Sequence, residues 1–299
     1  MIAPASSAPT PPGELRGALI VARFSLRESL RRRVFVVVGL LTVLFLGLYG
    51  LATWQAFESA EEFATGNTAG VAAEEVVGAT MAGLAMFAIL FLGTILAVFL
   101  TLGAVRGDAE RGLLQPLLVR PLPRRTLLLG RWLGATAVCA PYVVLVTLAS
   151  FVLTDALGGW WPDRTVTPLL ALALGVTILA ALSLAGSIVL ASTANGIGVF
   201  MLFGAGLTAG LLGQIAEAIN SDNLENIASI ATWALPFEAL YQAGLADLTV
   251  DTVGFARLAI DLGPFGGAQS GGFDLWLFSL AYLAAVGAAA VAAFARRDL

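Results

Sequence analysis

The residues best suited to a specific interaction lie in one arginine-rich segment, residues 106–131, which reads RGDAERGLLQPLLVRPLPRRTLLLGR. Charged residues open it, and an apolar stretch of about two helical turns follows at 112–119. Pro121 and Pro123 then end the stretch, because two prolines at that spacing cannot continue a helix. An apolar helix at an aqueous surface is costly unless it docks against another protein. We therefore predict a docking element for a soluble partner.

The residues that are missing exclude most catalytic chemistry. All 16 basic residues of the 299 are arginine, the chain has no histidine, and it has one cysteine, Cys139. P-loops and Schiff bases need lysine, whereas zincin sites, histidine triads and histidine-ligated haem need histidine. A lone cysteine makes neither an intrachain disulfide nor a thiolate metal site, so we expect Cys139 to be a small buried apolar residue. We expect no enzyme activity, metal or cofactor on this chain.

The composition indicates a membrane protein, since 59% of the residues are hydrophobic and 12% are charged, against roughly 25% charged in soluble domains. A membrane-spanning helix needs about 20 apolar residues. Six charge-free segments qualify, and we predict an all-α integral membrane protein with six transmembrane helices at 34–54, 76–105, 132–154, 169–191, 197–215 and 275–295. The cluster Ser192–Gly196 predicts a tight turn between the fourth and fifth spans.

The N-terminal part predicts an amphipathic interfacial helix. Residues 1–13 are small and proline-rich, which favours a disordered tail. Residues 14–33 have helical periodicity, and apolar side chains form a stripe beside arginines: Leu15, Leu19, Ala22, Leu26 and Leu30 beside Arg16, Arg23, Arg27 and Arg31. Such a helix lies in the membrane interface, with its arginines toward anionic lipid headgroups. The alternative is a plain cytoplasmic extension of the first span.

A long segment, residues 216–274, precedes the last span. Its apolar part, 227–244, is broken at Leu235-Pro236, which favours a re-entrant or surface-lying helical pair over a seventh span. Residues 251–262 have the pattern of one more amphipathic helix, and the glycine-rich residues 263–272 form a flexible link.

Charge placement predicts the orientation. Fourteen of the 16 arginines lie before the first span, in 106–131 or at the C-terminus, whereas 15 of the 20 acids lie in the opposite loops. By the positive-inside bias, both termini and segment 106–131 are cytoplasmic, and we expect a multi-pass protein of the cell membrane.

Segment 106–131 resembles the second cytoplasmic segment of the type-2 class of ATP-binding cassette (ABC) exporter permeases. That segment has a glutamate, then Gly-Thr-Leu, a Leu-Leu pair, proline and arginine, followed by an apolar run and Gly-Lys. The matching residues here are Glu110, Gly112, Leu114, Leu117, Leu118, Pro121, Arg124 and Gly130. Three residues depart from the pattern: Leu113 replaces threonine, Pro116 interrupts the short helix, and Arg131 replaces lysine.

The resemblance covers essentially the whole chain. The helix at 14–33 resembles the family's connecting helix, Leu235-Pro236-Phe237-Glu238 resembles its outer re-entrant element, and the ending at 294–299 resembles its Arg-Asp terminus. It implies the permease subunit of an exporter. It also implies ATP and Mg on a dimer of separate ATPase subunits, a second permease copy or a homologous permease, and no nucleic-acid partner.

The resemblance also implies roles for individual residues. Asp108, Glu110, Arg111 and Gly112 would position the ATPase-coupling helix, and Leu114, Leu117 and Leu118 would fill a groove on the ATPase. Arg120 and Arg124, on either side of Pro121, would pair with its acids or with lipid phosphates. The alternative for these arginines is that they only determine topology.

The fifth predicted span contains Gly206, Gly210 and Gly213, and the first two have the GxxxG spacing that lets helices approach closely. These glycines are candidates for a subunit interface or substrate pathway. Packing within the chain is the alternative.

The same residues bear on three other functions. An ion-coupled secondary transporter usually carries ionisable groups inside its spans, and the six predicted spans have none. A membrane enzyme would need convergent acids or bases, whereas the acids here are scattered in loops. A non-transporting assembly protein remains a further alternative. Charge-free spans favour a hydrophobic or amphipathic cargo, and the sequence leaves its identity open.

Overall fold

The chain folds into long, roughly parallel helices in a computed structural model that describes residues 14–30, 34–64, 70–102, 123–219, 221–248 and 271–296. Six of these helices are long and apolar enough to cross a membrane: α2 (Val34–Ala64), α3 (Gly70–Thr101), α6 (Arg124–Gly158), α7 (Val166–Val189), α8 (Ser192–Ile219) and α12 (Phe273–Ala295). The shorter described helices are α1 (Glu14–Leu30), α9 (Asp222–Ala234) and α10 (Pro236–Leu248). The predicted fold class is confirmed: an all-α membrane protein with six apolar helices and a short N-terminal helix.

Several helices extend beyond the apolar stretches that predicted them. Helix α2 continues to Ala64, and α6 begins at Arg124, so the last eight residues of segment 106–131 are helical. Hydropathy marks only the part of a helix that matches the hydrocarbon layer, and polar residues do not end a helix that leaves it. The tail 1–13, the helix expected at 251–262 and most of the glycine-rich link lie outside the described residues.

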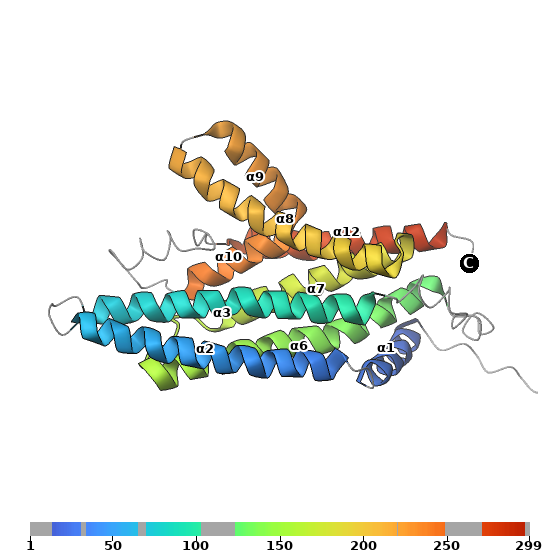
Figure 1. Ribbon diagram of the computed structural model, residues 1–299. Helices are drawn as coiled ribbons and strands as arrows, with labels where there is room; N and C mark the ends of the chain where they lie inside the picture. Colours follow the sequence, from blue (N-terminus) through green and yellow to red (C-terminus); the bar gives the residue numbers. More distant parts are fainter. Residues whose placement is uncertain are drawn as a thin grey trace, which may run out of the picture.

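Basic and acidic residues of the described helices lie mainly at opposite ends of the bundle. Figure 1 shows α1, the α7–α8 turn and the C-terminal end of α12 at one end of the bundle. The described arginines of α1, of the start of α6 and of the end of α12 therefore share this end, whereas Glu58, Glu74, Glu75 and Asp155 belong to the opposite helix ends. This segregation matches the charge pattern from which the orientation was predicted.

A polar junction joins α3, α7 and α8 at the arginine-rich end. The Thr101 and Ser183 hydroxyls form a hydrogen bond at 2.6 Å, and the Asn195 side-chain amide donates to the Ser183 carbonyl at 2.8 Å. All three side chains are buried. Asn195 therefore belongs to the first turn of α8, and the chain reverses at residues 190–191 rather than across Ser192–Gly196. The Asn195 side-chain amide bonds to another helix, and turn propensity, which is a local property, does not predict such a contact.

Two tyrosine–threonine pairs join α2 to α6. The Thr42 hydroxyl donates to the Val38 carbonyl, so the Tyr142 hydroxyl is the donor in the 2.7 Å bond to Thr42. The Tyr49 hydroxyl likewise donates to Thr154, because the Thr154 proton goes to the Ser150 carbonyl. These bonds fix the rotation of α2, the least buried of the six spans.

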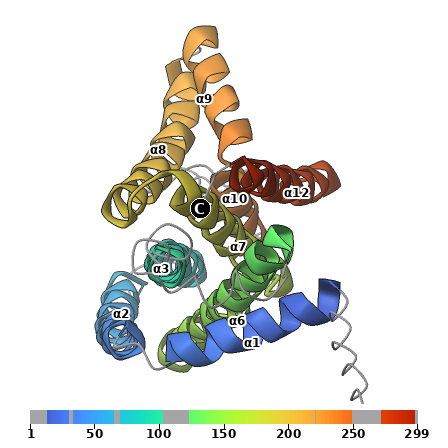
Figure 2. The same cartoon turned by 90° about the vertical axis from the view of Figure 1, so that its right-hand side faces the viewer.

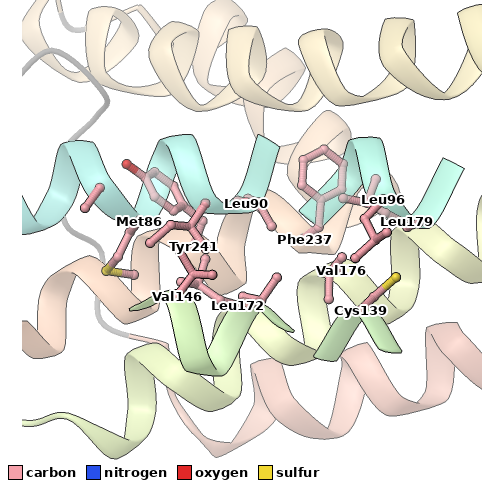
Figure 3. Close-up of a cluster of buried hydrophobic side chains, with 14 of the residues drawn as sticks. Met86, Leu90, Leu96, Cys139, Val146, Leu172, Val176, Leu179, Phe237 and Tyr241 are labelled. Carbon is pink, nitrogen blue, oxygen red and sulfur yellow. The ribbon is translucent and has the colours of Figure 1, made fainter. Parts of the chain in front are cut away.

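The largest cluster of buried apolar side chains lies among α3, α6, α7 and α10. Figure 3 shows Met86, Leu90 and Leu96 of α3 facing Cys139 and Val146 of α6 and Leu172, Val176 and Leu179 of α7, with Phe237 and Tyr241 of α10 inserted among them. Cys139 is fully buried, as predicted. A helix too short to span the membrane is thus part of the core.

Helices α8 and α9 form a pair that stands away from the rest of the bundle, as Figure 2 shows. The pair carries exposed apolar side chains, including Ile219, Ile227 and Ile230, and Trp233 at the end of α9 packs on Phe278 of α12. The break predicted at Leu235-Pro236 separates α9 from α10.

We expect the double variant Tyr49→Phe/Tyr142→Phe to melt at a lower temperature in detergent. The substitutions remove both interhelical donors and keep the rings. Hydrogen bonds between membrane helices contribute about 0.6 kcal/mol each on average, so the expected loss of stability is about 1 kcal/mol. Tyr282→Phe is the matched control, because the Tyr282 hydroxyl has no hydrogen-bond partner among the described residues. Equal melting of both variants and the wild type would contradict the role of these bonds.

Candidate functional site

Helix α1 is seated on the beginning of α6 through two glycines. A side chain at Gly130 would meet the Val21 Cβ at 2.5 Å and the Ala18 carbonyl oxygen at 2.8 Å, and one at Gly134 would meet the Ala22 carbonyl oxygen at 3.2 Å. The backbones therefore approach at two successive turns of α6. Since α6 starts directly after residues 103–122, α1 and the exit of segment 106–131 form one packed unit.

The face of α1 that contacts α6 differs from the predicted apolar stripe. The buried residues are small, namely Gly17, Ala18 and Val21, whereas Leu19, Ile20 and Phe24 are exposed. Small residues let membrane helices approach closely, and large apolar residues are left to contact acyl chains. Arg16 and Arg23 are exposed beside them, as an interfacial helix requires.

The predicted ATPase-coupling residues are mostly beyond what the structure describes. Asp108, Glu110, Arg111, Gly112, Leu114, Leu117, Leu118, Arg120 and Pro121 lie outside the described residues, and so does Arg31. Arg124 is the first residue of α6, after Pro123, and Arg27 lies in α1; nothing is described of either side chain. Their coupling roles stay predictions.

Helix α10 packs on glycines of three other helices. Side chains at Gly83 of α3, Gly175 of α7 and Gly206 of α8 would meet Leu245, the Phe237 backbone and the Phe237 ring, respectively. Gly175 lies nine residues into α7, which is about 14 Å along the helix. The other end of α10 is held at the acidic end of the bundle, where the Asp163 amide donates to the Leu248 carbonyl and Arg164 pairs with Asp247 at 3.8 Å. Helix α10 therefore begins inside the bundle, near Gly175 and Gly206, and ends at the acidic end, as expected for a re-entrant helix.

A buried carboxylate lies in the first turn of α10. Glu238 is 3% exposed and faces Gly210 of α8, where any side chain would overlap its Oε1. The Gln242 amide donates to this oxygen at 2.9 Å. Burial raises the pKa of Glu238 to about 7, against the lowering effect of the Gln242 hydrogen bond. The carboxyl group therefore titrates near neutral pH.

The three predicted glycines of α8 pack within this chain. Gly206 faces Phe237 and Gly210 faces Glu238, both on α10, whereas Gly213 faces Ala228 of α9. The subunit-interface hypothesis for these glycines stays a prediction.

Sequence reasoning did not select Glu238 as a site residue, although it noted the motif that contains it. The available signal was an acid two residues after a proline inside an otherwise apolar stretch. Hydropathy alone could not predict that Glu238 is buried, because the burial depends on Gly210 of α8 lying opposite the carboxylate.

These features define a class: a six-span helical membrane protein with an interfacial helix seated at one end and a re-entrant helix inserted from the other. The chain belongs to the ABC-2 family, since the family described as "ABC-2 family transporter protein" matches residues 19–299. No curated protein matches the sequence. The chain is therefore the membrane component of an ABC transporter, a permease, as the resemblance implied.

We expect Gly130→Leu to displace α1 from α6, because the Ala18 carbonyl is backbone and cannot make room for a leucine. The readout is maleimide labelling of a Val21→Cys reporter in membranes, with buried Cys139 as the slow background. Labelling should be several-fold faster in the Gly130→Leu background. Gly47→Leu is the control, because a side chain there meets nothing within 4 Å. Equal labelling rates in all backgrounds would rule out the packed unit.

A second prediction concerns pH. The pKa of Glu238 is about 7 in the folded protein and near its ordinary 4.5 when unfolded, so the folded state retains a proton between these values and stability falls as pH rises from 4.5 to 7. Glu238→Gln removes the penalty, which is up to about 3 kcal/mol at pH 8 and absent at pH 4.5. In detergent melts, Glu238→Gln should exceed the wild type at pH 8 and match it near pH 4.5. The exposed control Glu58→Gln should follow the wild type. Parallel melting profiles of wild type and Glu238→Gln would contradict the raised pKa.

Proposed function

We propose that this permease is an exporter subunit for a hydrophobic or amphipathic substrate, driven by ATP hydrolysis on a separate ABC ATPase dimer. ATP and Mg would bind to that partner. Segment 106–131 would dock on the ATPase, and the arginine-rich end of the bundle would face the cytoplasm. The observation that carries the proposal is the packing of α1 on Gly130 and Gly134, at the end of the docking segment.

The proposed mechanism is alternating access. Closure of the ATPase dimer would push on the segment around Glu110. Because α1 and the start of α6 approach backbone to backbone, the push would move them together. The exposed Arg16 and Arg23 would hold α1 in the interface through lipid headgroups, so the displacement would tilt α6 instead of sliding α1 out of the membrane.

The membrane part would be completed by a second permease, either another copy or a homologue. The α8–α9 pair, with its exposed apolar side chains, and the exposed face of α2 are the surfaces that lipid or this second permease would cover. The charge-free spans support an apolar or amphipathic cargo, since an ion pathway usually carries ionisable groups.

The docking hypothesis predicts the result of a double substitution. Glu110→Arg with Leu117→Asp should leave membrane insertion intact and uncouple ATP hydrolysis from transport. It should also weaken co-purification with the partner ABC ATPase by about ten-fold or more, because a charged residue would replace an apolar one in the ATPase groove. The measurements are ATPase retained on the purified permease and the ATP hydrolysis rate of the complex in nanodiscs.

The matched control places the same substitution types at the opposite end of the bundle. Glu58→Arg with Leu157→Asp alters two exposed positions on α2 and α6, and both readings should stay at wild-type values. If the Glu110/Leu117 variant also retains wild-type ATPase binding and coupling, segment 106–131 is not the docking element.

A further inference from the structure

The buried carboxylate of Glu238 does not cap the N-terminus of the helix that carries it. An acid at the third position of a helix often caps its N-terminus by accepting from the backbone amide of the preceding turn. Here that amide, on Leu235, already donates to the Ala231 carbonyl. The only hydrogen bond of the carboxylate among the described residues comes from Gln242, on its own helix. Within the described residues, the carboxylate is therefore tied only to its own helix and makes no hydrogen bond to another helix.

Within the described part of the chain, the negative charge also has no positive partner. No described arginine forms an ion pair with Glu238, and burial is the largest influence on its pKa. A carboxylate removed from water is stable when a cation is brought to it. A small metal ion is a poor occupant, because it prefers about six oxygen ligands and no cluster of three or more metal-ligating residues occurs in the described part of the chain.

Aromatic rings connect the carboxylate to the surface of the bundle. Phe237, next to Glu238, stacks on Phe203 with ring centroids 5.7 Å apart and planes 9° apart. Phe203 contacts Phe91 at 5.7 Å, and Phe91 is 41% exposed. Phe203 and Phe237 are buried. Aromatic faces attract organic cations, so separation of these two rings would present cation-compatible faces beside Glu238.

The carboxylate lies at a seam that a moving helix can open. Phe237 and Glu238 meet Gly206 and Gly210, one turn apart on α8, and α8 leaves the bundle together with α9 (Figure 2). A displacement of α8 away from α10 would uncover the carboxylate and the aromatic faces together.

We propose that the seam between α8 and α10 is a binding site for a lipophilic organic cation, whose charge pairs with Glu238 and whose apolar part lies against Phe203 and Phe237. The inference names a substrate class and so rests on the proposed export function. Among amphipathic substrates, it selects those with a delocalised or shielded positive charge.

The test uses two probes of the same shape and opposite charge, tetraphenylphosphonium and tetraphenylborate. Binding to the full-length permease in zwitterionic nanodiscs is measured by equilibrium dialysis at pH 8, with empty nanodiscs subtracted. The wild type should bind tetraphenylphosphonium saturably, and Glu238→Gln should weaken its affinity at least ten-fold. Phe203→Leu, which keeps an apolar side chain and removes the ring, should weaken it about three-fold. Glu58→Gln should leave it unchanged, and tetraphenylborate binding should not depend on Glu238.

Folding is checked by size exclusion and by melting of each variant, and Glu238→Gln is expected to be at least as stable as the wild type. The proposal is overturned if the wild type shows no saturable cation binding, if Glu238→Gln binds like the wild type, or if both probes bind alike. The assay contains no ATPase, so cation binding is judged separately from the coupling measured with the Glu110/Leu117 variant. Failure of one therefore leaves the result of the other intact.

Discussion

The insertion of α10 into the bundle is the constraint on which the other helices depend. Thirteen residues cannot cross a bilayer, so this helix must bury its sides against protein. Lipid tails are as apolar as leucine, and burial of apolar side chains alone gives little driving force inside a membrane. The compensating interactions are close packing on Gly83 and Gly206, and polar contacts at the acidic end of the bundle with Asp163 and Arg164. The α8–α9 pair diverges from the bundle beside α10, which packs against Gly206 and Gly210 of α8.

Helix α6 connects segment 106–131 with the region around α10. It has 35 residues and is therefore about 52 Å long. Its first turns contact α1 at Gly130 and Gly134, and the loop after its last turn holds the end of α10 through Asp163 and Arg164. A tilt of α6 that begins at the docking segment would therefore reach the re-entrant helix without passing through any other span.

The sequence was sufficient to predict the six spans, the N-terminal helix and the break at Leu235-Pro236, because hydropathy and proline stereochemistry are local properties. It did not predict the ends of α2, α6 and α8, since polar residues do not stop a helix outside the hydrocarbon layer. It did not identify the face of α1 that contacts α6, because periodicity groups large apolar residues and does not tell a lipid contact from a helix contact. The Ser183 carbonyl bound by Asn195, the Phe237 ring at Gly206 and the glycine that faces Glu238 belong to other helices, so no local pattern could predict these contacts.

The tyrosine–threonine pairs of α2 have a consequence for assembly in the cell. Thr42 and Tyr49 find their partners on α6, 100 and 105 residues later in the chain. At synthesis rates of about 5 to 20 residues per second, α2 waits roughly 5 to 20 s in the bilayer before Tyr142 and Thr154 are made. During that interval its hydroxyl groups can bond only to their own helix, to α3 or to water at the interface. The order of synthesis therefore separates insertion of the first span from its final rotation, which is set only when α6 arrives.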